Sequence, residues 1–593
     1  MSTAQTSSKI SNSAEATPCT DRSLLLPSHS GRNVFPNSPF FGRLLRHAHR
    51  NGTAVRDLKL GIEKTYEELL SDVLGLRQVL RDSLSLDTLE ALEKGEEIYI
   101  GVLAGGGYEF AVAILAVLAI GAAAVPLSVV LPVQEAAYFV SKSKLVAILT
   151  ASTASTLGQS IARYVNKEHN MSVQSIEVMR NLPQDSISAA EMLISANLYL
   201  DDNAAGAVIF TSGTTGPPKG AVMRRAFVHD SAMAVAEHYG ITYNDVILHV
   251  LPVHHATGLG ITFFPFILAG ACIEFKSGSF DPGWMWERWR QGGLTFFSGV
   301  PTIYMRMMRF YDQHLAKLPE QKRAQYVHGV NEIRAMLCGS SALPKPVQDF
   351  WTRIRNGKII LTRYGATEFG AVFKVPVDAK GIPDGSVGTA VSGVDVKLSE
   401  GNEGEILIRS PYMFSKYLFD DAATVAAHDP EGYFRTGDIG MRQGSHYWII
   451  GRASLDIIKS GGYKISALDI EREVLGLPYI SEVMVVGVAD EEFGQRVGAV
   501  VTLRDDQDIY SFGDNIEGKK LSLDDLRKDL RGRLAGYKLP TLLRIIKGDL
   551  PKGQSGKVLK KKLGPELFPC PGWETHAEVQ VWRNQKAAIM ARL

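Results

Sequence analysis

The stretch AGAVIFTSGTTGPPKG, residues 205–220, decides the fold, because a buried strand is predicted to run straight into a loop suited to an anion. Residues 205–210 are apolar throughout, as in a strand at the centre of a parallel sheet. The loop that follows combines glycines and hydroxyl side chains with one lysine, Lys219. Glycine lets backbone N–H groups turn toward a polyanion, and the hydroxyls and the lysine add donors and charge. The spacing differs from GxxxxGK[ST], so we predict a phosphate-binding loop other than the P-loop. Its residues are Thr211, Ser212, Gly213, Thr214, Thr215, Gly216, Pro217, Pro218 and Lys219.

Strand-like apolar runs alternate with amphipathic helical patterns on both sides of this loop. The runs are IYIGVLA (98–104), LVAILTA (145–151), DVILHVLP (245–252), LTFFSGVP (294–301) and IRAMLCGSS (333–341). This alternation predicts the α/β class, with helix-covered parallel sheets in a large N-terminal domain. Short strands between 385 and 409 predict a small β-subdomain, and a smaller, mobile α+β C-terminal unit begins near Gly451. The predicted boundaries are a disordered leader at 1–35, an N-terminal domain at 36–452, a C-terminal lobe at 453–565 and a tail at 566–593.

Length and composition exclude several classes of protein. A chain of 593 residues needs more than one domain, and 45% hydrophobic with 21% charged residues is ordinary for a globular protein. Lys and Arg number 64 against 63 Asp and Glu, and this balance predicts no nucleic-acid partner. The cysteines have no metal-ligand spacing and are predicted to be free thiols: Cys19, Cys272, Cys338 and Cys570.

An uncharged stretch at 111–132 needs a check for a membrane span. Gly121, Pro126 and Pro132 interrupt it, so we predict a buried helix from about Glu109 to Ile120, a turn at Gly121 and a strand into Pro126. The chain is therefore predicted to have no membrane span.

Two terminal segments bear on localisation. Residues 1–22 are rich in Ser and Thr and lack the apolar core of a secretory signal. The last three residues, Ala591-Arg592-Leu593, keep the small-basic-leucine pattern read by the peroxisomal import receptor. We predict a peroxisomal protein, with a cytoplasmic one as the alternative.

Further motifs follow the phosphate loop in a fixed order. They are LPVHHATG (251–258), GSSALP (339–344), RYGATEFG (363–370), YFRTGD (433–438), GR (451–452), DIIKSGGYK (456–464) and LPKGQSGK (550–557). With these motifs nearly the whole chain past the leader resembles the adenylate-forming superfamily of acyl-CoA synthetases, luciferases and peptide-synthetase adenylation domains. The resemblance implies an AMP-forming acid:CoA ligase, which adenylates a carboxylic acid with ATP and passes the acyl group to CoA.

Adenylation brings two anions together, because a carboxylate attacks the α-phosphorus of ATP. Cations and N–H donors must hold the polyphosphate while Mg²⁺ neutralises it. The resemblance implies that Glu368 is the Mg²⁺ ligand and that Thr367 lies near the α-phosphate. The other nucleotide contacts it implies are Gly339, Ser340 and Tyr364 around the adenine, Asp438 on the ribose hydroxyls, and Arg452 near ribose and phosphate.

The C-terminal lobe carries Lys557 in a Gly-rich turn, where a flexible ammonium can bridge the carboxylate oxygen and the α-phosphate. Its basic neighbours are expected to form a solvated face: Lys552, Lys560, Lys561 and Lys562. In the family this lobe rotates between adenylation and thiolation. The resemblance places the pivot at Ser454, where many relatives carry Asp, and the pantetheine channel at Ser460, Gly461 and Gly462.

The run VPTIYMR (300–306) looks closest to the malonyl-CoA synthetase branch. In that branch a basic residue at the position of Arg306 receives the distal carboxylate of malonate; the alternative is an ordinary arginine on an amphipathic helix. His254 and His255 match the acid pocket, with His255 as its catalytic gate. Thr257 stands where malonate-using relatives commonly carry a further histidine, so a fatty, aryl or other specialised acid stays open.

Three other functions stay open. The chain could load a carrier protein instead of CoA, or act as a luciferase-like oxygenase, which shares every motif. It could also be a non-catalytic adenylate-binding scaffold. Intact Lys219, Glu368, Asp438 and Lys557 argue against the scaffold.

Overall fold

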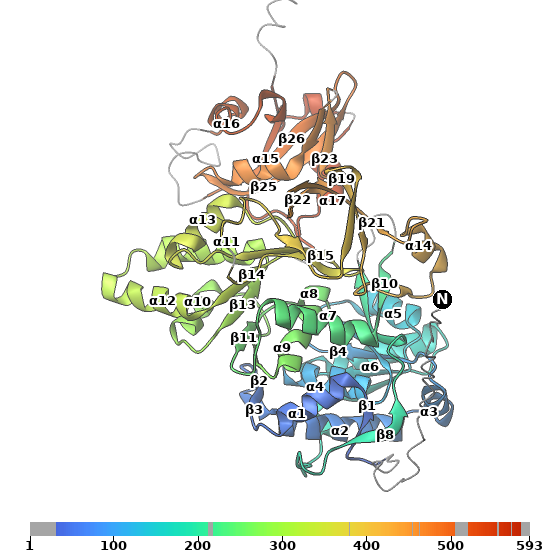
Figure 1. Ribbon diagram of the computed structural model, residues 1–593. Coiled ribbons are helices and arrows are strands. Elements are labelled where there is room, and N and C mark those ends of the chain that lie inside the picture. The colour runs from blue at the N-terminus through green and yellow to red at the C-terminus, as the bar shows by residue number, and fades with distance from the viewer. Residues whose placement is uncertain are drawn as a thin grey trace, which may run out of the picture.

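The protein is seen in a computed structural model that describes residues 31–211, 217–378, 380–453, 455–461, 463–504, 520–553, 557–570 and 572–582. Two large sheets with helices between them form the N-terminal part, and a smaller sheet with its own helices stands above them (Figure 1). The leader, the tip of the phosphate loop, the pivot Ser454 and the C-terminal tripeptide lie outside the described residues.

The first large sheet is parallel except at the edge that carries the phosphate loop. There β9 turns back into β10, which pairs antiparallel with β9 and with β20. In spatial order the strands are β20 (Lys416–Tyr417), β10 (Lys219–Arg224), β9 (Ala205–Thr211), β5 (Ala123–Leu127), β4 (Tyr99–Leu103), β6 (Ala147–Thr150) and β7 (Gln174–Glu177).

The second sheet has a parallel centre, β2–β12–β11–β13–β14–β15, that continues into antiparallel strands. Three of those antiparallel strands, β17, β18 and β19, lie within the β-subdomain predicted at 385–409. In spatial order the strands are β18 (Asp395–Glu400), β19 (Glu403–Arg409), β21 (Phe434–Gln443), β22 (His446–Arg452), β17 (Thr389–Ala390), β16 (Gly370–Lys374), β15 (Leu361–Ala366), β14 (Ala335–Cys338), β13 (Phe296–Gly299), β11 (Val246–His249), β12 (Cys272–Phe275), β2 (Thr53–Asp57) and β3 (Ile62–Thr65).

Alternate residues of the parallel strands enter different cores. In β4, Ile100 and Val102 face the layer between the two sheets, whereas Tyr99 and Leu103 face the outer helices. The shared inner layer contains α1 (Pro39–Ala48), α2 (Tyr66–Ser83), α4 (Tyr108–Ala119), α7 (Arg225–His238) and α9 (Phe264–Ala269).

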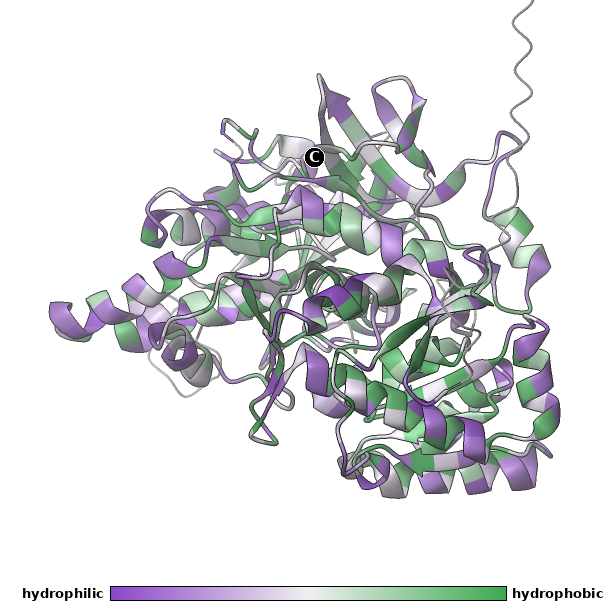
Figure 2. Cartoon of the chain, turned by 60° about the horizontal axis from the view of Figure 1, so that its bottom comes forward, coloured by the Kyte–Doolittle hydropathy of each residue, from purple (hydrophilic) through white to green (hydrophobic). Residues whose placement is uncertain are grey.

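The outer faces of both sheets are covered by helices that are apolar on their inner side and polar on their outer side (Figure 2). The first sheet is covered by α5 (Val133–Lys142) and α6 (Ser155–Glu168), and the second by α10 (Pro282–Arg290), α11 (Pro301–Phe310), α12 (Glu320–Glu332) and α13 (Lys345–Ile354). Smaller elements complete the N-terminal part: β1 (Val34–Asn37), β8 (Leu193–Tyr199), α3 (Leu86–Glu93), α8 (Ala256–Gly260) and α14 (Asp421–Ala426).

The C-terminal lobe is a mostly antiparallel sheet with helices on both faces. Its strands are β24 (Tyr463–Ser466), β23 (Ile457–Ser460), β25 (Ile480–Asp490), β26 (Gly494–Leu503), β27 (Leu542–Ile546) and β28 (Gln580–Val581). One face packs on α15 (Ala467–Leu475) and α16 (Leu523–Leu530), and the other on α17 (Lys560–Leu567). Side-chain contacts join this lobe to the N-terminal part; among them, Arg472 pairs with Asp384, Arg309 donates to the carbonyl of Ser481, and the hydroxyl of Ser466 donates to the carbonyl of Ile450.

Most sequence-based expectations for the fold are confirmed. The helix predicted at 109–120 is α4, its turn has Gly121 at φ +89°, and β5 follows. No described helix is both long and apolar enough to cross a membrane. Of the cysteines, Cys272, Cys338 and Cys570 are free thiols. The pattern of DLRKDLRGRLA (525–535) predicts a helix over the whole run, but α16 ends at Leu530, two residues before Gly532.

Candidate active site between the two lobes

Neighbouring parallel strands of the second sheet deliver seven of the predicted site residues to one edge. Strands β11, β13, β14 and β15 lie side by side with their carboxyl ends together. The carboxyl edge of a parallel sheet is where α/β proteins bind ligands. The segments that leave this edge carry His254 and His255 after β11, Arg306 after β13, Gly339 and Ser340 after β14, and Thr367 and Glu368 after β15.

The histidine loop after β11 is held in shape by its own backbone. The ring of His249 is buried, and its Nε2 donates to the carbonyl of Gly258 at 2.9 Å. A Cβ at Gly258 would lie 2.1 Å from the carbonyl oxygen of Pro252, so only glycine fits this turn. His255 caps the start of α8, and its ring lies 4.4 Å from that of His254.

Both histidines of this loop are neutral at neutral pH. Burial, together with the neighbouring His255, lowers the pKa of His254 to about 3. Burial also lowers the pKa of His255, with a second contribution from the charge of Lys557. Neither Nε2 atom has a hydrogen-bond partner among the described residues, so both can accept contacts from a ligand.

The phosphate loop is the tip of the β9–β10 hairpin, since Thr211 pairs with Lys219 across it. Residues 212–216, which include Ser212, Gly213, Thr214, Thr215 and Gly216, lie outside the described residues. The returning arm is anchored by Tyr138, whose hydroxyl donates to the carbonyl of Pro218 at 2.8 Å. The ammonium of Lys219 lies 5.1 Å from the centre of the Tyr417 ring.

Tyr417 also touches the predicted magnesium ligand. Its hydroxyl donates to a carboxylate oxygen of Glu368 at 3.0 Å. Burial raises the pKa of Glu368, and the Tyr417 hydrogen bond and the charge of Arg452 oppose this rise. One tyrosine therefore connects the lysine of the phosphate loop with the acidic residue after β15.

The predicted ribose carboxylate is held from two sides. Asp438 accepts a hydrogen bond from the hydroxyl of Tyr364 at 2.8 Å and another from Nε of Arg452 at 2.9 Å. Strands β21 and β22 pair Asp438 with Arg452 directly. Tyr364 stacks on Phe373 at 5.5 Å, which fixes one side of its ring.

The turn after β14 is strained where the adenine pocket is predicted. Ser340 has φ +72°, a backbone conformation that a non-glycine residue adopts at a cost of about 1–3 kcal/mol. Beside it, a Cβ at Gly339 would lie 3.1 Å from the side chain of Arg363. Such strain is typical of ligand sites.

Lys557 reaches this edge from the C-terminal lobe. Lys552 and Val558 form a β-bridge, and the N–H of Gly553 donates to the carbonyl of Lys557 at 2.8 Å. Burial lowers the pKa of the Lys557 ammonium, and the charge of Arg452 lowers it further, whereas Asp438 opposes both. Lys557 therefore lies close to Asp438 and Arg452 and to His255 of the histidine loop.

The expected solvated lysine face is wrong for two of its four members. Lys560 pairs with Asp456 at 2.6 Å and with Glu471 at 2.7 Å, and only 14% of its side chain is exposed. Lys552 pairs with Glu482. Lys561 and Lys562 are exposed.

The predicted pantetheine segment lies in the β23–β24 hairpin. Ser460 ends β23, and Gly461 has φ +54° at the turn; Gly462 and the pivot Ser454 lie outside the described residues. Within the described part of the chain, no hydrogen bond or ion pair joins Ser460 or Gly461 to Asp438. The C-terminal lobe thus turns the hairpin that carries Lys557, rather than the β23–β24 hairpin, toward Asp438.

Arg306 lies on α11, the helix that follows β13. Its side chain is exposed, and its guanidinium stacks over the ring of Phe280 at 4.9 Å. Among the described residues Arg306 has no acidic partner. In contrast Arg309, one turn further, is tied to Ser481.

Comparison with known proteins identifies the family. The AMP-binding enzyme family matches residues 45–418, and the family of AMP-binding enzyme C-terminal domains matches residues 469–557. The chain belongs to the AMP-binding enzymes.

Relatives of this AMP-binding enzyme are similar along nearly their whole length. A protein named CoA ligase from Gibberella moniliformis is 31% identical, with 90% of this chain and 95% of that protein covered. Malonate–CoA ligase ACSF3, mitochondrial, from Bos taurus is 33% identical over 90% of each chain. The ATP-bound MatB structure from Rhodopseudomonas palustris has the same fold, with a TM-score of 0.71, 23% identity and coverage of 89% and 99%.

Three residues of this AMP-binding enzyme site have no counterpart among the sequence-based candidates: Tyr417, His249 and Tyr138. Each contacts a predicted site segment through a side chain from another strand or helix. Tyr417 lies 49 residues from Glu368, so no local spacing reveals the contact. His249 is different, because an ionisable residue inside an apolar strand next to the histidine motif could have been noticed.

Proposed function

We propose that this enzyme, an AMP-forming acid:CoA ligase, activates malonate or another short dicarboxylic acid. The observation that carries the proposal is the exposed guanidinium of Arg306, which has no acidic partner among the described residues. Helix side chains tilt toward the helix N-terminus, and the N-terminus of α11 lies at the carboxyl edge of the sheet. An arginine fork held against Phe280 is suited to bind the second carboxylate in a bidentate manner.

In the proposed reaction the near carboxylate of the acid attacks the α-phosphorus of ATP, and pyrophosphate leaves. Lys557 donates to the attacking carboxylate oxygen and to the α-phosphate, where negative charge builds up in the transition state. The neutral ring of His255 closes the acid pocket beside Lys557 without adding a charge. Thr367 donates to the α-phosphate from the turn after β15.

The nucleotide is held by the two strands that pair Asp438 with Arg452. Asp438 accepts from both ribose hydroxyls, while Arg452 stays beside it as a donor to ribose and phosphate. Gly339, Ser340 and Tyr364 surround the adenine. The phosphate loop, from Thr211 to Lys219, binds the β- and γ-phosphates.

The residues present also fit Mg²⁺. Glu368 offers a hard carboxylate oxygen, and its hydrogen bond to Tyr417 leaves the other carboxylate oxygen for the ion. Mg²⁺ usually takes one or two protein carboxylates and completes its shell with phosphates and water. Within the described residues no group of three His, Cys, Asp or Glu side chains is placed to hold a metal. When bound, the ion would neutralise charge on the triphosphate.

Thiolation is proposed to follow a rotation of the C-terminal lobe about Ser454. The rotation would withdraw Lys557 and bring Ser460, Gly461 and Gly462 to the acyl-adenylate, where small residues allow the pantetheine arm to pass. CoA is the proposed acceptor. A carrier-protein thiol would enter by the same channel, and competition between CoA and a carrier protein for one acyl-adenylate measures the preference.

The acid is tested by pyrophosphate release over a panel containing acetate, malonate, methylmalonate, fatty and aryl acids, with and without CoA. Arg306→Leu removes the proposed carboxylate fork. Its matched control is Arg353→Leu, because Arg353 is also an exposed helix arginine stacked on a phenylalanine, at 5.7 Å from the Phe350 ring. Loss of two charge-assisted hydrogen bonds corresponds to about a hundredfold in kcat/KM.

We expect Arg306→Leu to lower kcat/KM for malonate about a hundredfold and for acetate less than about threefold. Arg353→Leu should leave both within about twofold. Equal losses for mono- and dicarboxylates would show that Arg306 is an ordinary helix residue. The second candidate, a fatty or aryl acid, is favoured by Thr257 in place of the expected histidine, and turnover with such an acid alone would establish it.

A further inference from the structure

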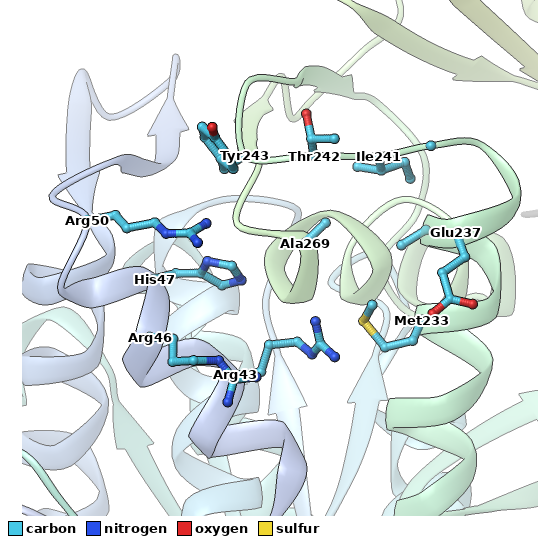
Figure 3. A pocket seen from close by; sticks show the side chains of 12 residues that line it. Arg43, Arg46, His47, Arg50, Met233, Glu237, Ile241, Thr242, Tyr243 and Ala269 are labelled. Atoms are coloured by element: carbon cyan, nitrogen blue, oxygen red, sulfur yellow. The ribbon is translucent and has the colours of Figure 1, made fainter.

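A cavity lies between α1 and the end of α7, and none of the residues assigned to the active site lines it. It has a volume of about 350 Å³, within the range of small-molecule sites. Arg43, Arg46 and Arg50 line one side, and Met233 and Glu237 of α7 line the other (Figure 3).

The three arginines are spaced so that they share one face of α1 and its continuation. Residues 43, 46 and 50 are related as i, i+3 and i+7, which places them on adjacent turns. None of them forms an ion pair in the described part of the chain. The Nε–H of Arg43 is buried and has no partner among the described residues. Like charges at this spacing repel one another, and this repulsion opposes the stabilisation that Arg46 gains from the helix dipole in the last turn of α1.

His47 shows that the cavity wall is electropositive. Its ring is buried, and Nε2 hydrogen-bonds to the carbonyl of Leu268 at 2.9 Å. Burial lowers the pKa of His47, the Leu268 contact opposes this, and the charges of Arg50, Arg43 and Arg46 lower it further. The imidazole is therefore neutral, and the guanidinium groups carry the positive charge of this wall.

The rest of the cavity is suited to an apolar or planar group. Met233, Ile241 and Ala269 provide apolar surface. Tyr243 stands at the rim with 58% of its surface exposed, and the guanidinium of Arg50 lies 4.9 Å from its ring centre. A tyrosine ring with one open face can stack on a base.

We propose that this cavity binds a nucleotide-sized organic phosphate, with the phosphate groups on Arg43 and Arg46 and the planar group against Tyr243. A phosphate group is the natural partner of two guanidinium forks, because each fork can donate two hydrogen bonds. The three arginines and Glu237 leave the cavity lining with a net charge of about +2, so its ligand is expected to be an anion. This site is separate from the ATP site described above.

The test counts ADP bound per chain by equilibrium dialysis of the full-length protein with labelled ADP. Wild type should bind two ADP molecules per chain. The double variant Arg43→Gln/Arg46→Gln should weaken one of the two sites about a hundredfold, while kcat/KM for ATP stays within about twofold. The matched control is Arg163→Gln/Lys167→Gln, because these exposed basic residues lie on α6 and neither of them lines the cavity.

Further measurements distinguish a role of Arg43 and Arg46 in ligand binding from a role in stability. Removing two like charges should leave the melting temperature unchanged or raise it, whereas a fall in the melting temperature would show a structural role for the arginines. Tyr243→Ala should weaken ADP at this site about tenfold but not inorganic pyrophosphate. A single ADP site in wild type, or an equal loss in the α6 control, would overturn the proposal. If pyrophosphate binds as tightly as ADP, the nucleoside contributes nothing to binding, and the proposed contact of the planar group with Tyr243 is overturned.

Discussion

The hydroxyl of Tyr417 joins two parts of the active site, and the substitution Tyr417→Phe removes that one oxygen. The hydroxyl donates to Glu368 at 3.0 Å, while the ring lies 5.1 Å from the ammonium of Lys219. Phenylalanine keeps the ring and therefore the contact with Lys219. Any change in the variant reports on the Glu368 hydrogen bond.

The magnitude follows from the hydrogen bond that is lost. A hydrogen bond to a charged group contributes about 1.5–3 kcal/mol, and the half-buried Glu368 can regain part of this from water. We therefore expect a loss of about 1.5 kcal/mol, which is about tenfold in kcat for adenylation. The requirement for Mg²⁺ should rise as well, because Glu368 is then free to turn away from the ion.

The pH dependence provides an independent readout. Burial raises the pKa of Glu368, and the Tyr417 hydrogen bond lowers it. The variant should therefore have a still higher Glu368 pKa, and a protonated carboxyl cannot bind Mg²⁺. The acid limb of the rate profile should move to higher pH, so the loss is greater at about pH 6 than at about pH 8.

The assay is pyrophosphate release at saturating acid, with Mg²⁺ titrated at several pH values. Tyr433→Phe is the matched control, since the Tyr433 hydroxyl also donates to a carboxylate, Asp395, at 2.6 Å, and Lys397 lies 4.4 Å from its ring centre. That variant should stay within about twofold of wild type, with its acid limb unmoved. A Tyr417→Phe enzyme with unchanged Mg²⁺ and pH profiles would refute the positioning role of Tyr417.

Three further predictions use other parts of the molecule. Lys557→Ala should reduce adenylation about a hundredfold or more but leave thiolation of a preformed acyl-adenylate within about threefold, as measured by single-turnover kinetics; equal losses would contradict its role. Gly258→Ala places a methyl group 2.1 Å from a backbone carbonyl oxygen and should destabilise the enzyme by about 2 kcal/mol, whereas Gly260→Ala, with nothing within 4 Å, should be neutral in thermal unfolding. Arg334→Leu leaves Asp245 buried without its partner and should cost about 3 kcal/mol at neutral pH. Burial raises the Asp245 pKa, but the hydrogen bonds from Arg334, Thr242 and Thr295 and the charge of Arg334 together outweigh it, so the folded-state pKa is lowered. The difference between wild type and variant should therefore shrink below about pH 4, and a constant difference would refute the pairing argument.

The local sequence pattern predicts the helices and strands of the scaffold, because whether such an element forms depends mainly on the residues within it. The buried α4, the turn at Gly121 and the strands that end in the histidine and Ser340 turns follow from periodicity and breakers alone. Since parallel strands share a carboxyl edge, the order of the motifs also predicts that their turns meet. The roles of these residues rest on the resemblance and stay predictions.

The tertiary structure alone decides which side chains are paired. Lys560 and Lys561 are adjacent in one basic run, yet Lys560 is enclosed by Asp456 and Glu471 while Lys561 is exposed. The sequence likewise gives no sign that Tyr417 spans Lys219 and Glu368. These contacts join residues tens to hundreds of positions apart. The approach of such residues is set by the packing of whole sheets and lobes, whereas periodicity reports only which face of its own element a residue occupies.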